Sequence, residues 1–172
     1  MIAAGGLTGC GDEDQPPAPP PPPTATGALA VTSEAFTEGA TIPPDFTCGG
    51  AGKAPPLTIK SDETALLALV VDDPDAPGGT YVHWVVFDLP STTTVLTADA
   101  LPIGARQGAN SAGGVGWTPP CPPSGTHHYR FTLYALKAPL GLRIGVPAAE
   151  AQQAIAAASV AQARLVGTVA AN

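Results

Sequence analysis

Three apolar stretches of strand length dominate the chain, and they are rich in β-branched and aromatic residues. They span residues 66–71, 81–89 and 128–136. The first two are continuous apolar runs, typical of strands buried on both faces, whereas the third alternates apolar with polar side chains. Turn-forming pairs such as Pro77-Gly78 separate the runs. This pattern predicts a mainly β fold.

One helix is indicated beside these strands, over residues 147–159. Pro147 suits the first position of a helix, and the interior is mostly alanine, which allows close packing but supplies little chemistry. Shorter strand patterns occupy residues 29–33 and 163–170. We therefore expect a single domain over residues 28–172, mainly β, with one or two helices at its periphery.

The first 27 residues differ in composition from the rest of the chain. The tetrapeptide Leu-Thr-Gly-Cys that ends at Cys10 resembles a lipobox, so residues 1–10 fit the remnant of a lipoprotein signal; the alternative is an accidental match. Residues 11–27 include a run of prolines, which favours a disordered, semi-rigid tether of about 3.1 Å per residue over a ligand for SH3-type domains. We expect an exported, periplasmic or cell-envelope lipoprotein.

The charge of the chain excludes some partners. Only 12% of the residues are charged, the formal net charge is −7, and no basic cluster is present. This argues against nucleic acid and against electrostatic attraction to anionic membranes. No apolar stretch reaches the roughly 18 residues that a membrane span needs. Contact with a membrane is therefore expected through the lipid on Cys10.

Polar residues that can bind a ligand lie near the ends of the apolar runs. Asp73 and Asp75 follow the first run, His83 lies near the start of the second, and His127 precedes the third. Two imidazoles can each donate a hydrogen bond to an anionic oxygen, and a carboxylate behind each imidazole would fix its tautomer. In the alternative interpretation the carboxylates only cap a turn and the histidines only pack.

Several motifs occur together and in order. They are Asp73-Pro74-Asp75-Ala76-Pro77, the segment from Tyr81 to Pro90, the segment from Gly116 to Phe131, and Leu165-Val166-Gly167-Thr168. With these motifs the chain resembles the phosphatidylethanolamine-binding protein family, in its bacterial Raf-kinase-inhibitor-like branch. The resemblance covers about residues 28–170. It implies an antiparallel β-sandwich with a small cavity for acetate, phosphate or a phospholipid head group.

The resemblance also implies which residues form the cavity. They are Asp73, Asp75, Pro77, Tyr81, His83, Pro119, Pro120 and His127. The implied function is non-enzymatic binding of a small anion or head group, without a cofactor, and modulation of a partner enzyme. The alternative is an interaction protein, similar to a kinase or protease inhibitor, that acts through surface loops and keeps a vestigial cavity. The branch also contains dimers, so a homodimer is a further expectation.

Catalysis and metal binding have weaker support. Ser124 lies near His127 but lacks the nucleophile-elbow pattern of serine hydrolases. A site formed by His83, His127 and Asp73 has a known set of metal ligands but no short spacing between its histidines. We expect neither an enzyme nor a metal site.

Cysteine usage predicts one disulfide. If Cys10 is lipidated, Cys48 and Cys121 remain, and thiols oxidise in exported proteins. A bridge between them would hold Pro119 and Pro120 against the domain and preorganise one wall of the cavity. The alternative is two separate buried thiols.

The lipid anchor can be tested by detergent partition. We expect the wild type to enter the detergent phase and Cys10→Ala to move to the aqueous phase, because the variant cannot be acylated. The double variant Cys48→Ala/Cys121→Ala is the control and should still enter the detergent phase. Equal partition of wild type and Cys10→Ala would contradict the anchor.

Overall fold

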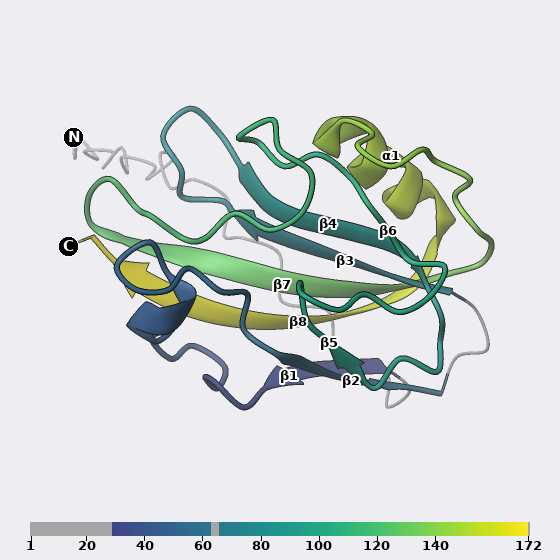
Figure 1. Ribbon diagram of the computed structural model, residues 1–172, viewed down its shortest axis with the longest axis horizontal. Coiled ribbons are helices and arrows are strands. Elements are labelled where there is room, and N and C mark those ends of the chain that lie inside the picture. Colours follow the sequence, from purple (N-terminus) through teal and green to yellow (C-terminus); the bar gives the residue numbers. More distant parts are fainter. Residues whose placement is uncertain (1–28, 63–65, 172) are drawn as a thin grey trace, which may run out of the picture.

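The computed structural model describes residues 29–62 and 66–171, and it forms two antiparallel sheets with one α-helix among these residues (Figure 1). The mainly β prediction is therefore confirmed. The expected signal remnant (residues 1–10) and tether (residues 11–27) lie outside the described residues. In chain order the elements are β1 (Leu29–Ser33), the 3-10 helix η1 (Pro44–Phe46), β2 (Leu57–Ser61), β3 (Leu66–Asp73), β4 (Tyr81–Leu89), β5 (Val95–Leu96), β6 (Arg106–Gln107), β7 (Thr126–Leu136), α1 (Ala148–Ala158) and β8 (Ser159–Ala170).

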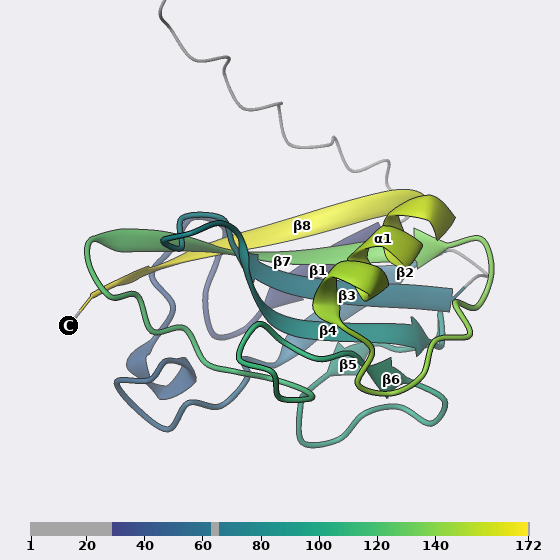
Figure 2. The same ribbon diagram turned by 90° about the horizontal axis from the view of Figure 1, so that it is seen from above.

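The elements are arranged in three layers. The larger sheet has the order β6-β4-β3-β7-β8 and the smaller one β1-β2-β5. The smaller sheet covers one face of the larger sheet and α1 covers part of the other, as the two views show (Figures 1 and 2). Strand β3 is central and pairs antiparallel with β4 and β7. It is covered on both faces, which explains its continuous apolar run.

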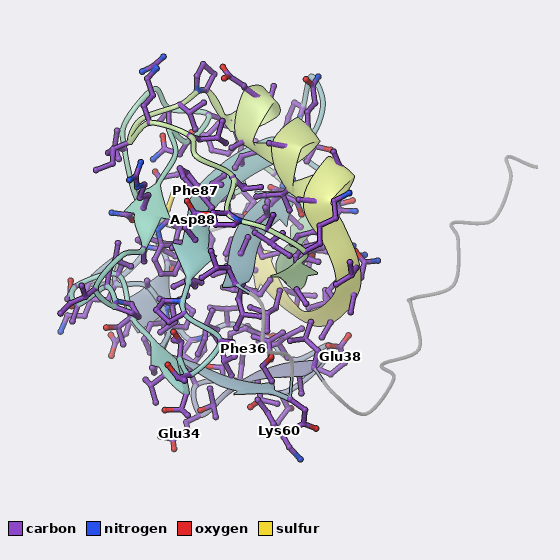
Figure 3. All side chains as sticks on the ribbon, turned by 90° about the vertical axis from the view of Figure 1, so that its right-hand side faces the viewer. Glu34, Phe36, Glu38, Lys60, Phe87 and Asp88 are labelled. Carbon is purple, nitrogen blue, oxygen red and sulfur yellow. A yellow bond between two sulfur atoms is a disulfide. The ribbon has the colours of Figure 1, made fainter. Side chains whose placement is uncertain are left out.

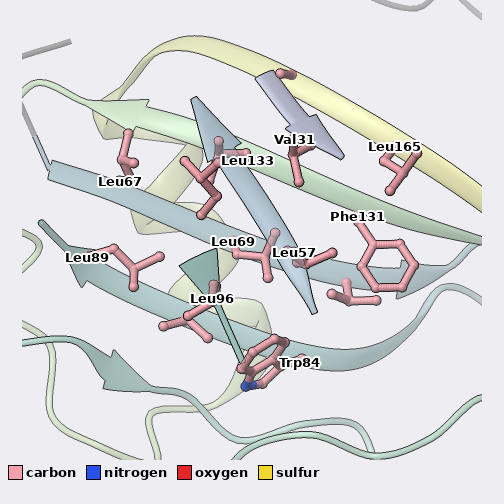
Figure 4. Packing of buried hydrophobic residues seen from close by; sticks show 14 of the residues in the cluster. Val31, Leu57, Leu67, Leu69, Trp84, Leu89, Leu96, Phe131, Leu133 and Leu165 are labelled. Carbon is pink, nitrogen blue, oxygen red and sulfur yellow. The ribbon is translucent and has the colours of Figure 1, made fainter. Parts of the chain in front are cut away.

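The main core lies between the two sheets. Leu57 of β2 packs there with Leu69, Trp84 and Phe131 of the larger sheet, and all four are fully buried (Figure 4). Phe36 joins them from the loop after β1, while Glu34 and Lys60 point outwards (Figure 3).

A second core lies beneath α1. Ala151 and Ile155 of the helix pack against Val70, Val85 and Phe87 of the larger sheet. The alanines of α1 allow this close approach, as the sequence predicts. The sheet below the helix is thus held rigidly between two apolar layers.

Some elements differ from the sequence prediction. Strands β2, β5 and β6 were not predicted. β5 and β6 have only two residues each, whereas β2 has five, as many as the predicted β1, and its alternation of apolar and polar residues was missed. Strand β8 begins at Ser159 rather than at residue 163, since Ser159 has extended backbone angles (φ −67°, ψ 135°) directly after the helix. The helix therefore leads into the edge strand without a loop.

Gly167 permits a close approach at the edge of the larger sheet. It pairs with Tyr129, and a Cβ atom at this position would lie 2.6 Å from Cγ1 of Ile42 and 2.8 Å from Cε2 of Phe36. We expect Gly167→Ala to lower the free energy of unfolding by about 1–3 kcal/mol through overpacking. Denaturant unfolding measures this loss. Gly114→Ala is the control, because its Cβ would meet only Asn110 atoms at 3.6 Å or more; equal losses in both variants would contradict the argument.

Candidate functional site

A cavity of about 350 Å³ lies at one end of the larger sheet. Strand β3 ends there, and β4 and β7 begin there (Figure 1). Six of the eight residues expected at the cavity line it: Asp73, Pro77, Tyr81, His83, Pro119 and His127. Residues that the sequence analysis did not assign to it complete the lining: Ala76, Thr118, Cys121, Pro123 and Tyr129. Three strand ends and one proline-rich loop thus converge on this space.

Asp73 and His127 form a buried pair in the cavity wall. Oδ2 of Asp73 lies 2.7 Å from Nδ1 of His127, and the two residues are only 3% and 6% exposed. Oδ1 of Asp73 accepts a hydrogen bond of 2.8 Å from the backbone N–H of Asp75. A buried carboxylate needs such partners, because losing its hydration costs several kcal/mol. One side chain therefore both caps the turn and fixes the imidazole, two roles that the sequence presents as alternatives.

His83 reaches the cavity because β4 contains a bulge. The register with β3 shifts between Val71 and Asp72, so that Trp84 pairs with Val71 and Val82 with Asp72. The extra residue, His83, lies on the same side as Trp84, and Trp117 is near both rings, at 6.4 and 6.0 Å. Bulges commonly redirect a side chain in this way next to functional sites.

The imidazole of His83 is held by a backbone group. Its Nδ1 donates to the carbonyl oxygen of Thr118 over 2.8 Å. The expectation of a carboxylate behind each imidazole is thus correct for His127 and wrong for His83. Burial lowers the pKa of His83 below its ordinary value, against the raising effects of the Thr118 carbonyl and of the Asp73 and Asp72 carboxylates. His83 is therefore a neutral imidazole near pH 7.

Asp75 and Pro120 do not line the cavity, although the sequence analysis places them there. Oδ2 of Asp75 accepts two hydrogen bonds from His128, from the backbone N–H at 2.8 Å and from Nδ1 at 2.7 Å. Burial would raise the pKa of Asp75, but these two donors lower it below its ordinary value. The contact holds the loop after β3 against the start of β7. Pro120 is buried, and its carbonyl accepts from the backbone N–H of Cys48.

Tyr129 is a cavity residue that the sequence analysis assigned only to a strand. It is fully buried, and its ring centroid lies 5.2 Å from that of His83, edge on. Burial and the Asp73 carboxylate raise the pKa of the Tyr129 hydroxyl. The signal for this residue was available, because positions two apart on a strand share a face and Tyr129 follows His127 by two.

The loop that forms the remaining wall is fastened at several points. Cys48 and Cys121 form the expected disulfide, with their Cα atoms 5.3 Å apart. The backbone N–H of Thr118 donates to the carbonyl of His83 over 3.0 Å, and that of Cys48 donates to Pro120 over 2.9 Å. The proline-rich wall is therefore tied both to β4 and to the loop after η1.

Within the part of the chain that the structure describes, no three His, Cys, Asp or Glu residues gather closely enough to hold a metal ion. In the same residues, no helix is long and apolar enough to cross a membrane. Ser124 lies in an exposed bend between Pro123 and β7 and does not line the cavity.

The fold and the cavity define a class: two antiparallel sheets that place a small, histidine-containing cavity at one end of the larger sheet. The family model for phosphatidylethanolamine-binding protein matches residues 32–170. The chain belongs to the phosphatidylethanolamine-binding protein family and is a binding protein of that type.

Relatives and solved structures agree with this assignment. The chain is 50% identical over 147 residues to LppC of Mycobacterium tuberculosis, named as a candidate lipoprotein, covering 84% of this chain and 73% of LppC. It is 39% identical over 146 residues to a UPF0098 protein of Methanothermobacter thermautotrophicus, covering 81% and 97% of the two chains.

Two crystal structures match its fold. A phosphatidylethanolamine-binding protein homologue from Chlamydia trachomatis, CT736, has a TM-score of 0.77 at 37% identity, covering 84% of this chain and 99% of that one. YbcL of Escherichia coli, described as a new member of the mammalian family, has a TM-score of 0.78 at 31% identity with the same coverage.

We expect the disulfide to contribute to stability by constraining the unfolded chain. Because 73 positions separate Cys48 from Cys121, the chain-entropy model gives about 4 kcal/mol for closing this loop. We expect Cys48→Ala/Cys121→Ala to lose up to that amount in denaturant unfolding. Reduction of the wild type is the matched control and should give a similar loss. An unchanged free energy of unfolding in both would show that the bridge does not constrain the unfolded chain.

Proposed function

We propose that the protein binds a small anionic ligand of the phosphate or carboxylate type in the cavity formed by Asp73, His83 and His127, without transforming it. The observation that carries this proposal is the buried Asp73–His127 pair inside a cavity with room for a ligand. A polar pair kept in such a space without a ligand-binding role is a cost to stability, because buried polar groups gain little over apolar ones.

The size of the cavity supports a small ligand. About 350 Å³ lies at the lower end of the range for ligand sites. This volume fits a phosphate group with a short substituent, such as a phospholipid head group, and leaves the acyl chains outside. Pro77, Pro119 and Tyr81 supply rigid apolar walls, and the histidines supply the polar contacts.

Binding without catalysis fits the groups that line the cavity. The pair of Asp73 and His127 resembles the base and orienting acid of a serine hydrolase, and covalent catalysis of that kind needs a nucleophilic side chain beside the base. Ser124 lies outside the lining, and Cys121 is held in the disulfide. The remaining polar groups are suited to recognition.

A location in the cell envelope supports a role at a membrane surface. LppC is named as a candidate lipoprotein, and this chain has its own lipobox-like tetrapeptide ending at Cys10. Acylation of Cys10 would hold the binding domain close to phospholipid head groups. In the competing proposal, surface loops contact a partner enzyme and the cavity has no role.

Ligand titration distinguishes these proposals. We expect inorganic phosphate and phosphoethanolamine to shift the NMR signals of His83 and His127 in the full chain. His127→Ala should weaken binding by about tenfold or more, because it removes a hydrogen bond to a charged ligand.

Thr126→Ala is the matched control. Thr126 is adjacent to His127, is exposed and does not line the cavity, so its loss should leave the affinity near that of the wild type. Absence of any shift at either cavity histidine on addition of phosphate or phosphoethanolamine would refute the cavity function and favour the surface loops.

A further inference from the structure

The direction of one hydrogen bond determines what His83 can offer to a ligand. A carbonyl oxygen can only accept, so the contact of 2.8 Å between Nδ1 of His83 and Thr118 places a proton on Nδ1. In a neutral imidazole the other nitrogen then carries a lone pair and no proton. Nε2 of His83 is therefore an acceptor, whereas the sequence analysis expects a donor.

This acceptor belongs to a ring that lines the cavity. Nε2 has no hydrogen-bond partner among the described residues. In residues 29–62 and 66–171, Thr93 Oγ1 is the one fully buried side-chain oxygen or nitrogen without a partner. Nε2 of His83 is therefore not fully buried. The ring of His83 lines the cavity. The rings of Tyr81 at 4.9 Å and Tyr129 at 5.2 Å hold it in place.

Conversion of His83 into a donor is opposed by its surroundings. Protonation would give His83 a positive charge, which burial disfavours, and burial therefore lowers the pKa of His83. The nearby Asp73 and Asp72 carboxylates raise that pKa but offset the effect of burial only in part. Asp73 is already bonded to Nδ1 of His127, and Asp72 accepts two hydrogen bonds of 2.7 Å from Arg130. The two carboxylates therefore have partners other than His83.

A fully ionised phosphate would meet an unfavourable contact in this cavity. Its oxygens only accept hydrogen bonds, so one of them would face the lone pair of His83 Nε2, and neither group would be satisfied. A phosphate group that keeps one proton presents both a donor and acceptors. Its P–OH can donate to His83 Nε2, while its charged oxygens remain available as acceptors.

We propose that the cavity selects ligands whose acidic group keeps one proton, namely phosphomonoesters in their singly ionised form, and that this proton is donated to Nε2 of His83. The inference rests on the proposed function of the cavity. It makes His83 a specificity-determining residue that favours monoesters over phosphodiesters, because a diester has no P–OH at neutral pH. An intact phospholipid head group would accordingly bind less well than the free phosphoethanolamine.

The test compares four probes on the full chain by calorimetry at pH values from about 5.5 to 8. They are phosphoethanolamine and inorganic phosphate, which have a P–OH group, glycerophosphoethanolamine, which is a diester, and ethanolamine alone. Because the second pKa of a phosphomonoester is about 6, we expect its affinity relative to the diester to fall about tenfold per pH unit above that value. Near pH 6 the monoester should bind about tenfold or more tightly than the diester. The diester also reports effects of pH on the cavity that both ligands share.

His83→Gln is the diagnostic variant, because its amide can present an N–H₂ donor as well as an oxygen acceptor where the neutral imidazole offers only an acceptor. We expect the preference for the monoester to shrink to within about threefold and to lose its dependence on pH. Thr126→Ala, outside the cavity, should keep the wild-type preference. If His83→Gln does not fold, nitrogen NMR of wild-type His83 in the phosphoethanolamine complex decides, with a protonated Nδ1 and an unprotonated Nε2 as the expected result.

Three outcomes would overturn the inference. Equal affinities for monoester and diester across the pH range, an imidazolium at His83 in the complex, or ethanolamine alone binding as tightly as phosphoethanolamine would each exclude a P–OH donor at this position. These results would leave the proposed function intact, because a ligand would still bind in the cavity. Failure of both phosphate probes to bind would instead overturn the proposed function and the inference together.

Discussion

The hydrogen bond between Asp73 and His127 joins the last residue of β3 to the beginning of β7, and the other groups of the cavity are arranged around it. The adjacent residue, Asp72, also connects β3 to β7. On the opposite face of the sheet, Asp72 forms a bidentate ion pair with Arg130, with two contacts of 2.7 Å. Two consecutive carboxylates thus hold β7 from both faces of the sheet. Because each would be costly without its partner, the two pairs specify the register of β3 and β7 at the end that carries the cavity.

The other walls of the cavity depend on separate anchors. The loop after β3 is held by Asp75 on His128, and the proline-rich loop is held by the disulfide and by hydrogen bonds to His83 and Cys48. Each wall is therefore fixed by contacts that lie mostly outside the space a ligand would fill. Such an arrangement preorganises the cavity, because little conformational entropy remains to be lost when a ligand binds.

The sequence predicted the parts of the fold that repeat a simple pattern. The apolar runs of β3 and β4 and the alanine-rich α1 were recognised because burial on two faces and close helix packing leave clear signals. The two-residue strands β5 and β6 have no periodicity from which to recognise them. The position of His83 depends on a bulge, and strict alternation would have placed His83 and Trp84 on opposite faces. The role of Asp75 was missed for a similar reason, since its partner His128 comes close only through the pairing of strands far apart in the sequence.

The pairing of β3 also governs how quickly the chain can reach its native state. Strand β4 follows β3 after a short turn, but β7, the other neighbour of β3, comes about sixty residues later, as the pair Val71 and Phe131 illustrates. Loop-closure entropy must be overcome before such a distant pairing contributes stability, so this topology is associated with slow folding. In the meantime one edge of the most apolar strand stays open to association with other chains. The bridge from Cys48 to Cys121 spans β3 and β4 and brings the segment that precedes β7 towards them, so early oxidation would shorten this search and the lifetime of the exposed edge.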